Sequence, residues 1–82
     1  MEDVTVKIQF ELPSDKVKEI DALMKMTGTN TRKEYFNNAL TLLEWAIEER
    51  YKGNTIAAID DKYQKVKELV MPILTAAAKA AR

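Results

Sequence analysis

The chain has 82 residues, with 13 Lys and Arg against 13 Asp and Glu and with no His or Cys. A chain this short forms one small domain whose burial is modest, so we expect association with another chain to add stability. The absence of Cys excludes a disulfide framework and a thiolate zinc site, and no apolar run approaches membrane-spanning length. We expect a cytoplasmic protein without membrane contact. Because the net charge is zero, any charged binding surface must be local.

Residues 4–12 alternate strictly between apolar and polar side chains, which predicts a β-strand with one buried face. The apolar set is Val4, Val6, Ile8, Phe10 and Leu12, and the polar set is Thr5, Lys7, Gln9 and Glu11. No hairpin turn follows this segment, so it has no local antiparallel partner. Pairing with the same strand of a second chain would close a two-stranded ribbon about a two-fold axis.

A first helix is predicted over residues 14–27. Pro13 and Ser14 suit its start, and Asp15 places negative charge in the first turn. Val17, Ile20, Leu23 and Met24 form one apolar stripe at helical spacing, and Gly28 suits the C-terminal cap.

A second helix is predicted from the capping box Thr31-Arg32-Lys33-Glu34 to about Tyr51, with Lys52-Gly53-Asn54 ending it. Its apolar positions cover more than one stripe, and we expect Trp45 among them in the core. They are Tyr35, Phe36, Ala39, Leu40, Leu42, Leu43, Trp45, Ala46 and Ile47. Such a helix packs against more than one neighbour, which again favours a dimer.

The remaining segments carry weaker signals. Residues 55–60 fit a short strand or a helical turn, and residues 63–71 fit a helix or a strand about equally, so a C-terminal hairpin is favoured only slightly. Pro72 ends either element. The Ala-rich end is predicted to be a frayed helix or a flexible tail.

The order of these features resembles the ribbon-helix-helix family of bacterial and archaeal repressors and antitoxins. The resemblance covers residues 4–50: strand, Leu12-Pro13, stripe helix, the turn from Gly28 to Glu34, and a long second helix with Ala39-Leu40 inside it. It implies a mainly α fold with a short N-terminal strand, in an intertwined homodimer with an intermolecular antiparallel two-stranded ribbon. The domain it implies is 1–52, for DNA binding and dimerisation. The residue patterns beyond it predict an extension over 53–74, with a short hairpin or helix, and a flexible Ala-rich tail over 75–82.

The resemblance also implies a function: a transcriptional repressor that inserts the ribbon in the major groove of double-stranded DNA. The base-contacting residues would be Thr5, Lys7 and Gln9, whose side chains can bond base edges. The phosphate-contacting residues would be Asn30, Thr31, Arg32 and Lys33, at a helix N-terminus that attracts anions. The polar strand face could instead be merely solvated, and Thr31 could be merely a cap. Glu11 would be repelled by phosphates.

Other functions are also open. With no His, no Cys and only one Ser, the chain is not expected to be an enzyme or to hold a cofactor or a metal. Asp60-Asp61 could bind a cation, but adjacent acids are more often an ordinary turn. The alternative function is a protein-interaction module, or an antitoxin whose residues 54–74 bind a partner protein.

Overall fold

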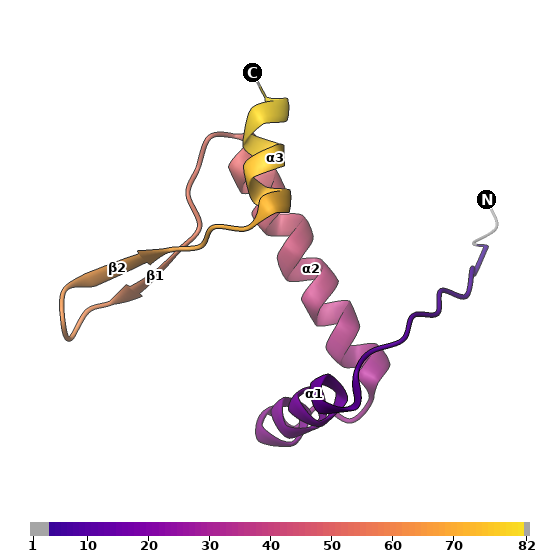
Figure 1. Ribbon diagram of the computed structural model, residues 1–82. Helices are drawn as coiled ribbons and strands as arrows, with labels where there is room; N and C mark the ends of the chain where they lie inside the picture. The colour runs from indigo at the N-terminus through magenta and orange to yellow at the C-terminus, as the bar shows by residue number, and fades with distance from the viewer. Residues whose placement is uncertain (1–3, 82) are drawn as a thin grey trace. The chain divides into compact units, whose positions relative to one another are not determined.

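Five elements make up the chain in the computed structural model, which describes residues 4–81. In chain order they are α1 (Ser14–Thr27), α2 (Arg32–Tyr51), β1 (Ala57–Asp60), β2 (Lys65–Glu68) and α3 (Pro72–Ala80) (Figure 1). The chain divides into two units, one ending at Tyr35 and one beginning at Phe36. We call them the N-terminal unit and the C-terminal unit.

The predicted fold class is wrong, because the strands lie in the middle of the chain and not at its N-terminus. Residues 4–12 form no strand, and their apolar side chains are exposed, Ile8 by 81%. A strand needs a neighbouring strand along its length, and within residues 4–81 the strands β1 and β2 pair only with each other. The alternation indicated which side chains share a face, but not that a partner strand exists. The architecture of residues 4–81 is therefore three helices and a hairpin, with no strand before α1.

Helix α1 has the bounds predicted from the sequence. Pro13 is its N-cap residue, and the Pro13 carbonyl accepts a hydrogen bond from the Val17 amide at 3.1 Å. At the other end Gly28 has a φ of 72°, and the Thr29 amide bonds back to the Met24 carbonyl at 2.9 Å. This left-handed cap satisfies carbonyls that the last helical turn leaves open. Ile20, in the middle of the predicted stripe, is buried.

Helix α2 also has the predicted bounds, and it ends at Tyr51, two residues before Gly53, whose φ is 93°. Its apolar surface is covered less than expected within the single chain. Ala46 is buried, whereas Leu40, Leu42 and Trp45 are exposed by 54%, 63% and 50%. The expectation that Trp45 lies in a core is wrong for the described chain. A helix with this much exposed apolar surface favours contact with a further apolar surface.

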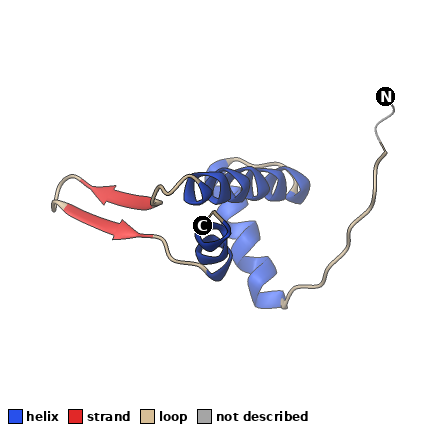
Figure 2. Ribbon diagram, turned by 90° about the horizontal axis from the view of Figure 1, so that it is seen from above, coloured by secondary structure: helices blue, strands red, loops and turns tan. Residues whose placement is uncertain are grey.

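Of the two structures considered for the segment after α2, the hairpin is the one that forms (Figure 2). β1 and β2 pair antiparallel, with Ile59 opposite Val66, and residues 61–64 connect them. The Asp60 carboxylate accepts hydrogen bonds from the Lys62 and Tyr63 amides at 3.1 and 3.3 Å, and Gln64 takes the left-handed conformation with a φ of 54°. Asp starts such turns well because its side chain bonds the backbone two residues on.

The Ala-rich end is helical. Pro72 does not merely end the element before it, but begins α3. Proline suits the first turn of a helix, where its missing N–H costs nothing. Leu74 of α3 is 1% exposed and lines the same hollow as Ala46 of α2, so the small core of the C-terminal unit lies where these helices meet (Figures 1 and 2). Within residues 4–81, no helix is both long and apolar enough to cross a membrane.

Candidate nucleic-acid interface

The start of α2 gathers the four residues predicted to contact phosphate. Thr31 precedes the helix, and its hydroxyl accepts a hydrogen bond from the Glu34 amide at 3.1 Å, so the predicted cap is formed. The Tyr35 amide bonds to the Thr31 carbonyl at 3.1 Å. A helix start carries a partial positive charge and free backbone amides, which is the arrangement that binds anions in many proteins.

Arg32 makes the best-defined side-chain contact at this end of α2. Its Nε and Nη2 groups donate to the two carboxylate oxygens of Asp21 on α1, at 3.2 and 3.0 Å. The hydrogen bond and the charge of Arg32 hold the pKa of Asp21 below its usual value, and Asp21 raises the pKa of Arg32. Both side chains stay about half exposed. The pair therefore orients the guanidinium without hiding it from a ligand.

Asp21 is the functional candidate that the sequence did not reveal. It lies 11 residues before Arg32, on a different helix, and only the turn between Thr27 and Thr31 brings the two together. No local spacing rule marks such a pair. Its consequence for binding is direct, because a carboxylate beside Arg32 cancels part of the charge that would attract a phosphate.

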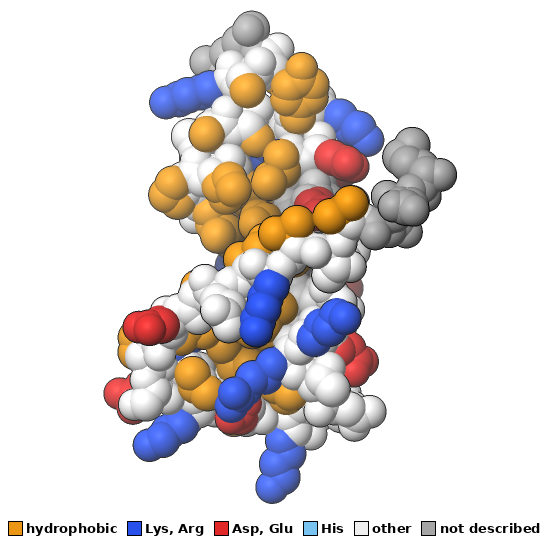
Figure 3. All heavy atoms as spheres, turned by 90° about the vertical axis from the view of Figure 1, so that its right-hand side faces the viewer, with side chains coloured by type: hydrophobic (Ala, Val, Ile, Leu, Met, Phe, Trp, Pro, Cys, Tyr) orange, Lys and Arg blue, Asp and Glu red, His pale blue; other side chains and the backbone are white. Residues whose placement is uncertain are grey.

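Asn30 and Lys33 complete the group at this helix start, and both are exposed. Since residues 30–33 are consecutive, they share one turn of chain around the N-terminus of α2. Figure 3 shows Lys and Arg side chains, with Asp and Glu between them, over the part of the chain that holds α1. The positive charge is thus local and interrupted, as the zero net charge requires.

The three residues predicted to contact bases lie on the extended segment before α1. Thr5, Lys7 and Gln9 are all exposed, in a stretch that forms neither helix nor strand. The side-chain hydrogen bonds described for Thr31 and Arg32 run to Glu34 and Asp21, and not to these three residues. The structure thus brings the phosphate candidates together but does not tie the base candidates to them.

The acidic pair considered as a cation site is accounted for by the hairpin. Asp60 accepts two backbone amides in the turn after β1, and the Asp61 carbonyl accepts from the Gln64 side chain at 3.3 Å. Among the described residues, no group of three acidic side chains is placed to hold a metal ion. The ordinary turn is the better interpretation.

Comparisons with protein-family models, with curated proteins and with solved structures found no match to this chain. The resemblance to ribbon-helix-helix repressors therefore stays a prediction about family.

Proposed function

We propose that this protein binds double-stranded DNA as a homodimer and regulates transcription, acting as a repressor. The observation that supports the proposal best is the start of α2, where Arg32 and Lys33 extend exposed from the positive end of a helix that Thr31 caps. Phosphate groups are the ligand class that such an end favours, and a cation beside it adds attraction of the same sign.

In this proposal the start of α2 positions the protein and does not select sequence. Contacts to phosphate fix register on the duplex but carry no direct sequence information. The Asp21 carboxylate holds the planar Arg32 guanidinium through two hydrogen bonds, and binding to DNA exchanges this partner for phosphate oxygens. Asp21 thereby weakens binding to any sequence and keeps non-specific affinity low.

Selection of sequence is assigned to the extended segment of residues 4–12. Thr5, Lys7 and Gln9 are exposed on it at alternate positions, the spacing at which an extended backbone presents side chains to one side. Lys can donate to guanine, Gln can pair with adenine, and Thr can contact a thymine methyl group. All three contacts lie in the major groove, so the extended segment would have to enter that groove.

The experiment is fluorescence anisotropy of labelled duplex DNA with the wild type and with Arg32→Ala plus Lys33→Ala. We expect wild-type affinity to fall steeply with salt and the double variant to bind more weakly on every sequence. Lys18→Ala plus Lys79→Ala is the matched control, because it also removes two exposed positive charges, both outside the proposed interface. If the control and the double variant lost DNA affinity equally, the loss would follow from the overall charge and not from the start of α2.

A second candidate function is suggested by the exposed apolar side chains of the hairpin. Ile59 and Val66 face each other across β1 and β2, and both are exposed. An isolated two-stranded hairpin is marginally stable, so a partner protein bound through residues 54–74 would stabilise it. Under this alternative, a partner protein would co-purify with the wild type but not with Ile59→Ser, and the wild type would not bind DNA.

A further inference from the structure

The C-terminal unit carries an apolar groove that its own side chains leave open. It has a volume of about 360 Å³. One wall is a stripe of α2, namely Ala39, Leu42, Leu43 and Ala46, whose spacing puts them on one helix face. The other side comes from Ile56 and Leu69 near the hairpin and from Leu74 of α3. Every residue that lines the groove is apolar.

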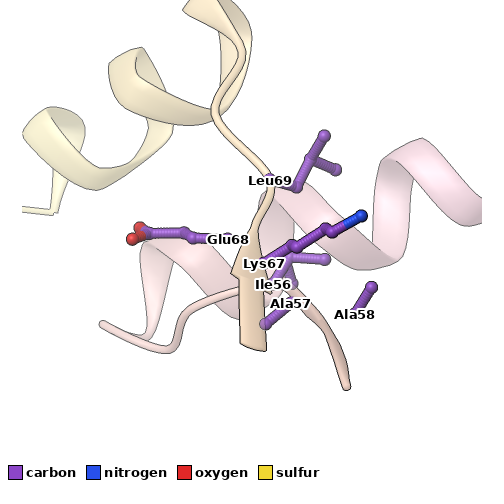
Figure 4. A pocket seen from close by; sticks show the side chains of 6 residues that line it. All are labelled: Ile56, Ala57, Ala58, Lys67, Glu68 and Leu69. Atoms are coloured by element: carbon purple, nitrogen blue, oxygen red, sulfur yellow. The ribbon is translucent and has the colours of Figure 1, made fainter. Parts of the chain in front are cut away.

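A second hollow of about 370 Å³ continues this surface around the base of the hairpin (Figure 4). Ile56 and Leu69 line both hollows, and the Leu69 amide bonds to the Ile56 carbonyl at 2.8 Å, which closes the base of the hairpin. Lys67 and Glu68 border the second hollow and point to opposite sides of the strand, as Figure 4 shows. The second hollow is therefore lined by four apolar and two charged side chains, and the apolar surface runs from α2 to the hairpin.

The chemistry of the groove excludes several occupants. A phosphate or a metal ion would find no charged or polar side chain in the lining. Small-molecule sites are mostly apolar too, but they carry a few polar groups that fix the ligand's orientation, and this groove has none on its side chains. What fits is another apolar protein surface.

The size of the core points to which protein supplies that surface. Within residues 4–81 the only buried hydrophobic residues are Ile20, Ala46 and Leu74, far fewer than a stable domain requires. The missing cover must be present whenever the chain folds. A second copy of the chain meets that condition, whereas an occasional partner does not.

The available area is also sufficient for a dimer. The C-terminal unit exposes many large apolar side chains, among them Leu42, Val70 and Ile73, and Figure 3 shows hydrophobic side chains gathered over the part of the chain that holds α3. Each such side chain offers on the order of 100 Å² of apolar surface. About eight of them reach the roughly 800 Å² per partner of a standard interface.

We propose that a second copy of this chain covers the groove, with the same surface of both copies meeting about a two-fold axis. The exposed Leu42 side chain lies at the open groove, so each copy offers both a projecting side chain and a groove. Such a surface is self-complementary, as a two-fold axis requires. The C-terminal unit is then the dimerisation unit, and the N-terminal unit is free to contact DNA. This proposal rests on the proposed function and locates the interface of the homodimer named there.

The test compares Leu42→Lys with Leu40→Lys by sedimentation equilibrium without DNA. Both residues are exposed Leu side chains of α2, but two residues turn the helix by about 200°, and only Leu42 lines the groove. We expect the wild type and Leu40→Lys to have twice the 9.4 kDa chain mass at micromolar concentration. Leu42→Lys should dissociate at least tenfold more readily, because an unpaired ammonium would be buried at the interface.

A spin-label measurement keeps the test decisive if Leu42→Lys fails to fold. The chain contains no Cys, so Leu42→Cys and Leu40→Cys each carry a single nitroxide. We expect a label at position 42 to be immobilised in the dimer and one at position 40 to stay mobile. Equal mobility at both positions, a folded Leu42→Lys that remains dimeric, or a monomeric wild type with another protein seated on the groove would overturn the inference. Dimerisation without DNA binding would leave it standing and remove the proposed function.

Discussion

Changing Asp21 and Arg32 should move DNA affinity in opposite directions. Arg32→Ala removes one phosphate contact per chain, and each contact contributes about 0.9 to the slope of log affinity against log salt. In a dimer the slope should flatten by about 1.8. Between about 50 and 200 mM salt, the wild type should therefore lose roughly twelvefold more affinity than Arg32→Ala loses over the same range.

Asp21→Asn should have the opposite effect, because it removes the carboxylate that both hydrogen-bonds and neutralises Arg32. We expect affinity to rise several-fold at low salt, equally on a selected duplex and on a shuffled one. The assay is an anisotropy titration at several salt concentrations. The control is Asp21→Asn combined with Arg32→Ala, since Asp21→Asn should lose its effect once Arg32 is absent. Weaker binding by Asp21→Asn would refute the reasoning, because it would mean that Asp21 assists Arg32 rather than competing for it.

Three further changes test the fold and the site. Leu74→Ala should destabilise the protein by about 2–5 kcal/mol and lower Tm by at least ~10 °C, because Leu74 is 1% exposed, whereas Leu40→Ala, at an exposed position outside the groove, should cost much less; equal costs in thermal melts would contradict the described core. Gly28→Ala should cost about 1–2 kcal/mol in denaturant titrations, since the added methyl meets no neighbour within 4 Å but the φ of 72° strains any L-residue; no loss would mean that the cap is not formed in solution. Carboxyl NMR should give Asp21 a pKa below the usual value, and this pKa should return toward the usual value in Arg32→Ala. The stability that the ion pair contributes is therefore present above the unfolded pKa of Asp21 and is lost as pH falls through the lower folded pKa. An unshifted pKa of Asp21 would mean that the pair does not form.

Both long helices could be predicted from the sequence because their ends depend on local chemistry. Gly28 supplies the left-handed cap of α1, and Thr31 caps α2 through the Glu34 amide three residues on. Such signals act within one helical turn, so they are visible in a short window of sequence.

The strands could not be predicted equally well, because strand formation depends on a partner elsewhere in the chain. The alternation of residues 4–12 predicted a strand, but among residues 4–81 no strand pairs with this segment. The hairpin that does form lacks a typical turn sequence, and its left-handed position is Gln64 rather than Gly or Asn. Likewise, Pro72 could end one element or begin another, and only the structure distinguishes the two.

The candidate site divides in the same way. It could be predicted that residues 30–33 lie together, because consecutive residues at a helix start are neighbours by necessity. That they bind anions stays a prediction. The contact between Asp21 and Arg32 was not predictable, since it depends on how the turn between α1 and α2 folds.

The central claim is that the N-terminal unit binds DNA, and its most direct test is selection from random double-stranded DNA followed by titration of the enriched duplex. The account predicts an enriched sequence that the wild type prefers over a shuffled duplex. Lys7→Ala or Gln9→Ala should lose about 1–3 kcal/mol on the enriched duplex alone. No enrichment, together with no binding of any duplex at about 50 mM salt, would contradict the account, because charge-driven binding is strongest there.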